Sequence, residues 1–363
     1  MAQTISTVDA VAKDYELTEP FRFATVTLET LNYALVRIRT SAGTVGYGEA
    51  SAYWDPTGET QEAVTGAVKL LAPYLLGKDA LELAALLDLC EAVAPGALSA
   101  RCAIDMALHD IAGQHFGVPV HVLLGGRSYP LRASMVLGLG KTEQLPTLLS
   151  SAQRSGYKLF KVKLGPDIQE NLATVETVCS QLNKGSAWFG DANQAWGSAK
   201  SALRHLRSLQ KYEPLWVEQP VSAGDWDSLE TVTRLSPISI IADESMCTCD
   251  DARRMVVARA VDGFNIKLNK CGGLRAGQCI MAVARAFHLR TTLGSMIEGE
   301  LGALANYHFG VSHRVDVTDL AAHWMIKNRV DVGLAVEAGN VVLRSEQAGL
   351  GYPDPGVFEA SFR

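Results

Sequence analysis

The sequence predicts an α/β fold in which parallel strands and helices alternate around a barrel, and one regularity in the middle of the chain supports this. A short apolar run that ends in a charged or polar residue recurs every 24 to 28 residues: FKVKLG, WFGDANQ, LWVEQP, SIIADES, FNIKLN, TTLGSMIE and RVDVTDL. This period fits one strand followed by one helix. In a barrel of this kind the functional residues gather where the strands end.

The parts of the chain before and after these repeats suggest two domains. Residues 1–125 read as strands followed by helices, because NYALVRIRT and TVGYGEA alternate around a turn and residues 60–93 have helical periodicity. We therefore expect an N-terminal α+β capping domain at 1–125. Residues 126–327 form the predicted barrel, with amphipathic helices such as 199–212 and 273–289 between strands. Seven strand–helix steps precede the last strand, which predicts a modified (β/α)7β TIM barrel.

Composition excludes several classes of function. A net charge of -6 over 363 residues gives no basic surface for nucleic acid. There is no apolar run of roughly 18 residues and no basic segment followed by an apolar one at residues 1–17, so we expect neither membrane insertion nor secretion. The seven cysteines are an odd number scattered over the chain, which indicates reduced thiols and a cytoplasmic protein. We read the pair Cys247 and Cys249 as part of an ordinary loop.

Three successive strands end in carboxylates, at Asp191, Glu218 and Asp243. Oxygen ligands without Cys or His beside them suit Mg²⁺. A single aspartate after a strand often only caps the next helix. Three acids at one period, with a lysine on either side of the trio, favour a magnesium site instead.

The lysines that flank this trio are Lys163 and Lys267, which end the second and the sixth predicted barrel strands. In a ring of eight strands these two positions are opposite each other. A substrate carboxylate on the metal would then present its α-carbon to both amines. Lys161 lies two residues before Lys163 and so on the same strand face, where its charge would help to lower the pKa of a lysine base.

Six short motifs occur along the chain in the order in which a known enzyme family has them. They are KVK (161–163), DANQAW (191–196), VEQP (217–220), ADES (242–245), IKLNKCGG (266–273) and GSMIE (294–298). Together with residues 101–126 and 20–51, they resemble the enolase superfamily, muconate-lactonizing-enzyme subgroup. Within that subgroup the chain looks most similar to dipeptide epimerases of the Ala-Glu type.

The resemblance implies a mechanism and a set of substrate contacts. It implies a Mg²⁺-dependent isomerase, a racemase or epimerase in which two opposed lysines remove and return the proton α to a carboxylate through an enediolate. It also implies that the tail, 328–363, returns to the cap, and that loops near 18–30 and 50–57 close over the barrel mouth. The residues expected near the substrate are Ser295, Met296, Ile297, Glu298 and Asp319 in the barrel, and Phe21, Arg22 and Trp54 in the cap, with Glu19, Phe23 and Asp55 also within reach.

One position departs from the family's pattern. Dipeptide epimerases end strand eight in an Asp-x-Asp pair that receives the substrate ammonium, whereas this chain has Asp319, Leu320 and Ala321. The substrate is then a dipeptide held by Asp319 alone, an N-acylated amino acid, or a compound without a charged nitrogen. N-acylamino acid racemase, o-succinylbenzoate synthase and muconate-type cycloisomerase stay open as alternatives, and a noncatalytic binding relative is the least favoured. We expect a small-molecule carboxylate as the partner and a homo-oligomer as the assembly.

The remaining polar and aromatic residues receive structural interpretations. Glu244 should point away from the barrel axis if Asp243 points inward, and we expect Lys270 to be a surface or loop charge. His323, which follows strand eight, is as compatible with the pocket as with the core. Core or helix positions are expected for His109, His115, His205, His288, Trp196 and Trp226.

Overall fold

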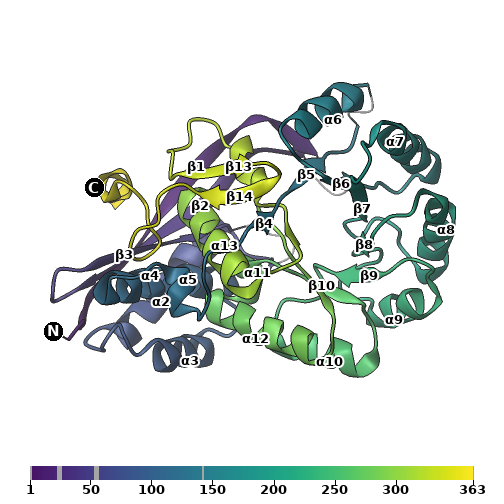
Figure 1. Cartoon of the computed structure of the whole chain (residues 1–363). Coiled ribbons are helices and arrows are strands. Elements are labelled where there is room, and N and C mark those ends of the chain that lie inside the picture. The colour runs from purple at the N-terminus through teal and green to yellow at the C-terminus, as the bar shows by residue number, and fades with distance from the viewer. Residues whose placement is uncertain (1, 23–26, 53–56, 141–142, 363) are drawn as a thin grey trace.

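The computed structural model describes residues 2–22, 27–52, 57–140 and 143–362. It consists of an α+β unit built from the N-terminal part of the chain and a barrel built from the middle part, which lie side by side in Figure 1. The predicted fold class is therefore confirmed. The boundary predicted near residue 126 falls between the short helix α5 (Val120–Leu123) and strand β4 (Leu131–Arg132), and the exact division into domains stays a prediction.

The N-terminal unit is a three-stranded antiparallel sheet covered by helices. Its strands are β1 (Ile5–Arg22), β2 (Thr27–Thr40) and β3 (Val45–Ala50), and its helices are α2 (Gln61–Leu75), α3 (Leu83–Val93) and α4 (Leu98–Phe116). The hairpin predicted from the alternation of β2 and β3 is present. Strand β1 precedes the first segment that the sequence analysis identified as a strand, residues 32–40. Helix α4 packs so closely on β3 that a Cβ at Gly48 would lie 1.9 Å from the carbonyl oxygen of Ala103, so only glycine fits there.

The barrel is a closed ring of eight parallel strands. Their sequence order is also their order in the sheet: β5 (Ser134–Leu137), β6 (Leu159–Lys163), β7 (Ala187–Asp191), β8 (Val217–Glu218), β9 (Ile240–Ala242), β10 (Gly263–Ile266), β11 (Arg290–Leu293) and β12 (Val317–Thr318). A parallel bridge between Ala133 and Thr318 closes the ring, and the Ser134 hydroxyl donates to the Thr318 carbonyl at 3.2 Å. A short 3₁₀ helix, η2 (Leu320–Met325), follows β12 in place of an eighth α-helix, as predicted.

The helices of the barrel lie outside this ring (Figure 1). They are α6 (Leu145–Arg154), α7 (Ile168–Gln181), α8 (Ala199–Leu209), α9 (Trp226–Leu235), α10 (Cys249–Ala258), α11 (Leu268–Cys271), α12 (Leu274–Ala286) and α13 (Glu300–His313), with a 3₁₀ turn, η1 (Gln210–Tyr212), after α8. Side chains cap the starts of several helices: Asp167 caps α7, Ser198 caps α8, Asp225 caps α9, and Thr248 forms a capping box with Asp251 on α10. Within the described ranges, we find no helix long and apolar enough to cross a membrane.

The C-terminal tail packs on both units. Strand β13 (Leu334–Glu337) pairs with β14 (Asn340–Leu343), and β14 pairs with β4. The chain ends in α14 (Pro355–Glu359) and η3 (Ala360–Phe362). The Glu359 carboxylate accepts a hydrogen bond from Arg37 at 2.8 Å and one from the Tyr47 hydroxyl at 2.6 Å. These bonds connect the tail to β2 and β3 of the N-terminal unit. Asp110 on α4 accepts the backbone N–H of Leu350 at 2.9 Å.

The cysteines contradict one expectation. Cys249 at the start of α10 and Cys279 in α12 form a disulfide, whereas the sequence suggested that all seven were reduced thiols. The sequence could not reveal the pair because the two residues are 30 positions apart and meet only when α10 and α12 pack together. The other five, Cys90, Cys102, Cys179, Cys247 and Cys271, are free thiols.

Candidate active site

Three carboxylates meet at the mouth of the barrel. Asp191 ends β7, Glu218 ends β8 and Asp243 follows β9, so neighbouring strands deliver them to the same edge. One oxygen of each lies within 4.8 Å of the others, and all three residues are buried. Burying like charges so close together is unfavourable unless a cation compensates them. The cluster is therefore able to hold a metal ion.

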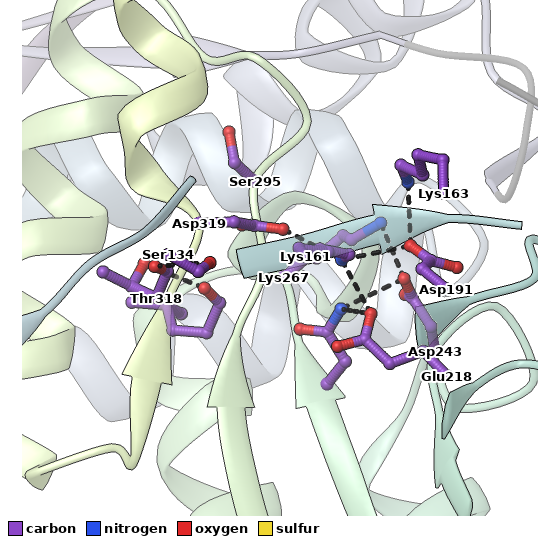
Figure 2. Close-up of polar contacts among 12 residues, drawn as sticks. Ser134, Lys161, Lys163, Asp191, Glu218, Asp243, Lys267, Ser295, Thr318 and Asp319 are labelled. Carbon is purple, nitrogen blue, oxygen red and sulfur yellow. Dashed lines mark hydrogen bonds and ion pairs between the residues drawn. The ribbon is translucent and has the colours of Figure 1, made fainter. Parts of the chain in front are cut away.

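The ammonium of Lys161 reaches into this cluster. Its Nζ lies 3.1 Å from Asp191 Oδ2, 2.7 Å from Glu218 Oε2 and 3.0 Å from Asp319 Oδ2 (Figure 2). Burial by itself would lower the pKa of Lys161, but the surrounding carboxylates outweigh it and raise the pKa well above its ordinary value. Lys161 is thus a permanent cation beside the carboxylate cluster.

Lys163 and Lys267 stand on opposite sides of the ring. Lys163 ends β6 and Lys267 directly follows β10, and β6 and β10 are four strands apart in a closed ring of eight. Lys163 Nζ lies 2.8 Å from Asp191 Oδ2, and Lys267 Nζ lies 2.9 Å from Asp243 Oδ2. Each lysine is therefore paired with a different carboxylate of the cluster.

Burial and ion pairing oppose each other in setting the pKa values of these groups. Burial raises the pKa of Glu218 to about 7, although Lys161 works against it. At Asp191 burial also favours the neutral form, but Lys163 and Lys161 overcome it and lower the pKa to about 2. Burial would lower the pKa of Lys267, and the carboxylate of Asp243 raises it instead. The charges of lysines and carboxylates are thus mutually dependent.

Lys270 is placed differently from the prediction. We expected a surface or loop charge, but Lys270 is fully buried, and its Nζ donates to Asp243 Oδ1 at 2.8 Å and to the Asp243 carbonyl. The reason is that the residues after Lys267 form the short helix α11, which brings the Lys270 side chain back to Asp243. Lys270 lies three residues after Lys267, a helical spacing that could have suggested a shared face.

Two asparagines that the sequence reasoning did not single out support the charged groups. Asn265 donates from Nδ2 to Glu218 Oε2 and to Asp243 Oδ2, both at 3.1 Å. It lies two residues before Lys267 and hence on the same strand face, a signal that was available in the sequence. Asn193 accepts from Lys163 Nζ at 2.8 Å and donates to Glu244 Oε1 at 3.1 Å. Glu244 is buried beside Asn193, and burial, together with Asp243, raises its pKa to about 8.

The loop after β11 folds around the carboxylate of Glu298. The Ser295 hydroxyl donates to Glu298 Oε2 at 2.5 Å, and the Met296 backbone N–H donates to Oε1 at 2.9 Å. The Ile297 N–H donates to the Ser295 hydroxyl oxygen at 2.9 Å. Tyr33 on β2 donates its hydroxyl to the Met296 carbonyl. The cap therefore contacts this loop directly.

The other predicted substrate contacts lie partly at the barrel mouth. Asp319 is buried after β12, and its Oδ1 has no hydrogen-bond partner among the described residues. Phe21 and Arg22, at the end of β1, approach the segment after β5: a Cβ at Gly138 would lie 3.4 Å from the Phe21 ring, and one at Gly140 would lie 3.9 Å from Arg22. The predictions for Trp54, and for Phe23 and Asp55, concern positions outside the described residues.

His323 and Trp196 are buried, and Trp226 is partly buried. His323 is buried, with Nδ1 3.0 Å from the carbonyl oxygen of Glu298, so it contacts the backbone behind the β11 loop. Trp196 is a core residue, as predicted, and His205 stacks on it with ring centroids 4.5 Å apart. Trp226 is partly buried against the same core.

Comparisons with known proteins agree with this architecture. Residues 5–125 match the mandelate racemase / muconate lactonizing enzyme N-terminal domain, and residues 146–353 match the family described as enolase C-terminal domain-like. The chain is 32% identical to an L-Ala-D/L-Glu epimerase of Bacillus subtilis, over 92% of this chain and 93% of that protein. It is 28% identical to an N-succinyl-L-Arg/Lys racemase of Bacillus cereus, over 96% of this chain and 94% of that protein.

A solved structure is similar over nearly the whole length. It is a dipeptide epimerase of Cytophaga hutchinsonii in complex with Mg and the dipeptide D-Ala-L-Val, with a TM-score of 0.91 and 27% identity, covering 99% of this chain and 98% of that one. The similar proteins are epimerases and racemases, which confirms the predicted enzyme class, an isomerase. The chain therefore belongs to the mandelate racemase/muconate lactonizing enzyme family of the enolase superfamily.

Proposed function

We propose that this protein is a Mg²⁺-dependent epimerase that removes and returns the proton α to a carboxylate, with dipeptides as its first substrate class. The observation that carries the proposal is the position of the carboxylate cluster between two lysines on opposite strands of the ring. Inversion at a carbon needs one base on each face. This arrangement supplies both.

Asp191, Glu218 and Asp243 are the residues that would hold Mg²⁺. Three buried oxygen donors without nitrogen or sulfur fit a hard divalent cation. When bound, the ion supplies positive charge that stabilises the dianion left after loss of the α-proton. Replacing any one of the three by its amide should abolish turnover and weaken Mg²⁺ binding measured by calorimetry. An amide variant with wild-type turnover at low Mg²⁺ would contradict the assignment.

Lys163 and Lys267 are the proposed bases, and Lys161 is a supporting cation. A lysine accepts a proton only when it is neutral, whereas the ion pair of Lys267 with Asp243 favours the protonated form of Lys267. The proton affinity of Lys267 thus depends on the charge that Asp243 carries. Lys161, fixed among Asp191, Glu218 and Asp319, adds a positive charge on the strand face that also carries Lys163.

The dipeptide assignment rests on Asp319 and on the related enzymes. One oxygen of Asp319 pairs with Lys161, and the other has no hydrogen-bond partner among the described residues, so it can accept from a substrate ammonium. Two of the similar proteins are epimerases of dipeptides. Ala321 favours a second candidate, racemization of N-acylated amino acids, because the second carboxylate of the family's ammonium site is missing from the sequence. A similar protein is a racemase of N-succinyl amino acids.

The two candidates are separated by restoring that carboxylate. Ala321→Asp should raise kcat/KM for dipeptides with a free N-terminus, because a charge-assisted hydrogen bond contributes on the order of 1 to 3 kcal/mol, or about 5- to 150-fold. N-acetylated dipeptides should gain nothing, since the added charge would be desolvated without a cationic partner. If the wild type prefers the blocked substrate and Ala321→Asp leaves that preference unchanged, the N-acyl substrate is the better assignment.

A further inference from the structure

The disulfide between Cys249 and Cys279 lies next to the segments that carry the site. Cys249 is the first residue of α10, and α10 follows the strand that precedes Asp243. Cys279 belongs to α12, and only α11 with its flanking residues separates α12 from Lys267. The two Cα atoms are 5.8 Å apart. The bond therefore joins the two helices that follow neighbouring strands of the site, β9 and β10.

A cavity between the cap and the barrel gives access to this disulfide. It measures about 420 Å³, within the range of small-molecule sites, and both Cys249 and Cys279 line it, together with residues of α3 and α4. The two arginines that line it are each paired with an acid: Arg275 lies 2.5 Å from Asp88 and Arg101 lies 3.1 Å from Glu91. The cavity thus has room for a small molecule and no strong preference for either charge.

The two sulfurs of the disulfide are chemically unequal. Cys279 is exposed, whereas Cys249 is half-buried at the N-terminus of α10. A helix N-terminus stabilises a thiolate, and the more stable thiolate is the better leaving group in thiol–disulfide exchange. An incoming thiol should therefore attack the exposed sulfur of Cys279 and expel Cys249.

The free thiols nearby do not compete for such a reaction. Cys271 lines the same cavity, but it is buried, and burial raises its pKa to about 12. Cys102 is fully buried, and its pKa is also raised by burial. A thiol that remains protonated is a poor nucleophile. Cys247, a partly exposed free thiol two residues before Cys249, also has its pKa raised by burial. The disulfide is therefore the more reactive group in this region.

We propose that the Cys249–Cys279 disulfide is a thiol-reactive modification site at which a low-molecular-weight thiol becomes attached to Cys279. The thiolate of the small molecule forms a bond to Cys279 Sγ, the Cys249–Cys279 bond breaks, and its electron pair leaves with Cys249 as the thiolate. A second thiolate then releases Cys279 as a thiolate and leaves with the first as a disulfide. The small thiol is the reductant in both steps.

Opening the disulfide should loosen the segments on either side without unfolding the chain. Helix α12 keeps separate ties to the cap, because the Arg275 backbone N–H donates to Asp105 at 2.9 Å and its guanidinium pairs with Asp88. Helix α10 keeps its capping box. The expected change is faster backbone hydrogen exchange at residues 244–249 and 272–279, with the rest of the barrel unchanged.

The test is mass spectrometry of the intact protein treated with reduced glutathione, without any reductant during purification. We expect the mass of one glutathione per chain at early times, before the second step removes it, mapped to Cys279 in preference to Cys249 by on the order of tenfold. Cys249→Ser should form an adduct with oxidised glutathione at the exposed Cys279. Cys179→Ser, which changes a half-buried free cysteine far from the cavity, is the matched control and should behave as the wild type.

Three results would overturn the proposal. Alkylation of the denatured, unreduced protein at all seven cysteines would show that the disulfide does not form. An adduct mainly at Cys249, or equal adducts at both sulfurs, would show that the helix N-terminus and exposure do not direct the reaction. If backbone hydrogen exchange at residues 244–249 and 272–279 stays unchanged after reduction, the disulfide does not hold the segments beside the active site. All of these readouts are independent of substrate turnover.

Discussion

Replacing Lys161 by methionine tests whether the carboxylate cluster depends on a cation. The substitution keeps the length of the side chain and removes a buried charge that lies 2.7 to 3.1 Å from three carboxylates. Removing one partner of a buried ion pair costs about 3 to 5 kcal/mol, because the other charge is left uncompensated. An unfolding entropy of about 2.1 cal/mol/K per residue gives about 0.8 kcal/mol/K for this chain, so the melting temperature should fall by about 4 to 6 °C.

The assay is thermal unfolding of both proteins in EDTA and in saturating Mg²⁺. Mg²⁺ should restore most of the loss in Lys161→Met, since a ligand at 100 times its Kd adds about 2.7 kcal/mol. Lys327→Met is the matched control: Lys327 also lies 2.9 Å from a carboxylate, Glu16, but both side chains are more than half exposed, and such pairs contribute at most about 1 kcal/mol. If Lys161→Met in EDTA is as stable as Lys327→Met, or if Mg²⁺ stabilises wild type and Lys161→Met equally, the reasoning is wrong.

Three further predictions follow from other parts of the structure. Cys249→Ser opens a loop spanning 30 positions and should cost about 3.5 kcal/mol, seen as a drop of about 4 °C in melting temperature; no drop would contradict the disulfide. Burial lowers the pKa of His308 to about 4, below its unfolded value of about 6.5, so roughly 3 kcal/mol of stability is present above pH 6.5 and lost as the pH falls toward 4. Urea midpoints of His308→Gln should show a flatter decline over that range, and an identical decline would refute it. Tyr33→Phe removes the hydroxyl that donates to the Met296 carbonyl, which should destabilise the loop after β11 by about 1 to 3 kcal/mol. In steady-state kinetics it should raise KM more than it lowers kcat. An unchanged KM would show that this loop does not contribute to substrate binding.

The parts of the site that the sequence predicted are those fixed by a single strand. Asp191, Glu218 and Lys163 end their strands, and Asp243 and Lys267 follow theirs directly. Because every parallel strand of a barrel delivers its end to the same edge, the position within one repeat was enough to bring these residues together. The fold class could be predicted for the same reason.

The parts that the sequence did not predict depend on contacts between distant segments. Lys161 and Asp319 are 158 positions apart and pair only because β6 and β12 belong to one closed ring. Lys270 was expected at the surface because charge alone indicates exposure, and only the turn made by α11 buries it against Asp243. The Cys249–Cys279 bond likewise needs the packing of α10 on α12.

The measurement that tests the central claim most directly is α-proton exchange in deuterated water, followed by NMR on separate stereoisomers of one substrate. With Lys163 and Lys267 on opposite faces, Lys163→Ala should stop exchange from one α-carbon configuration and keep it from the other, and Lys267→Ala should do the reverse. Loss of exchange from the same configuration in both variants would contradict the two-base mechanism and favour a one-base dehydration or cycloisomerization.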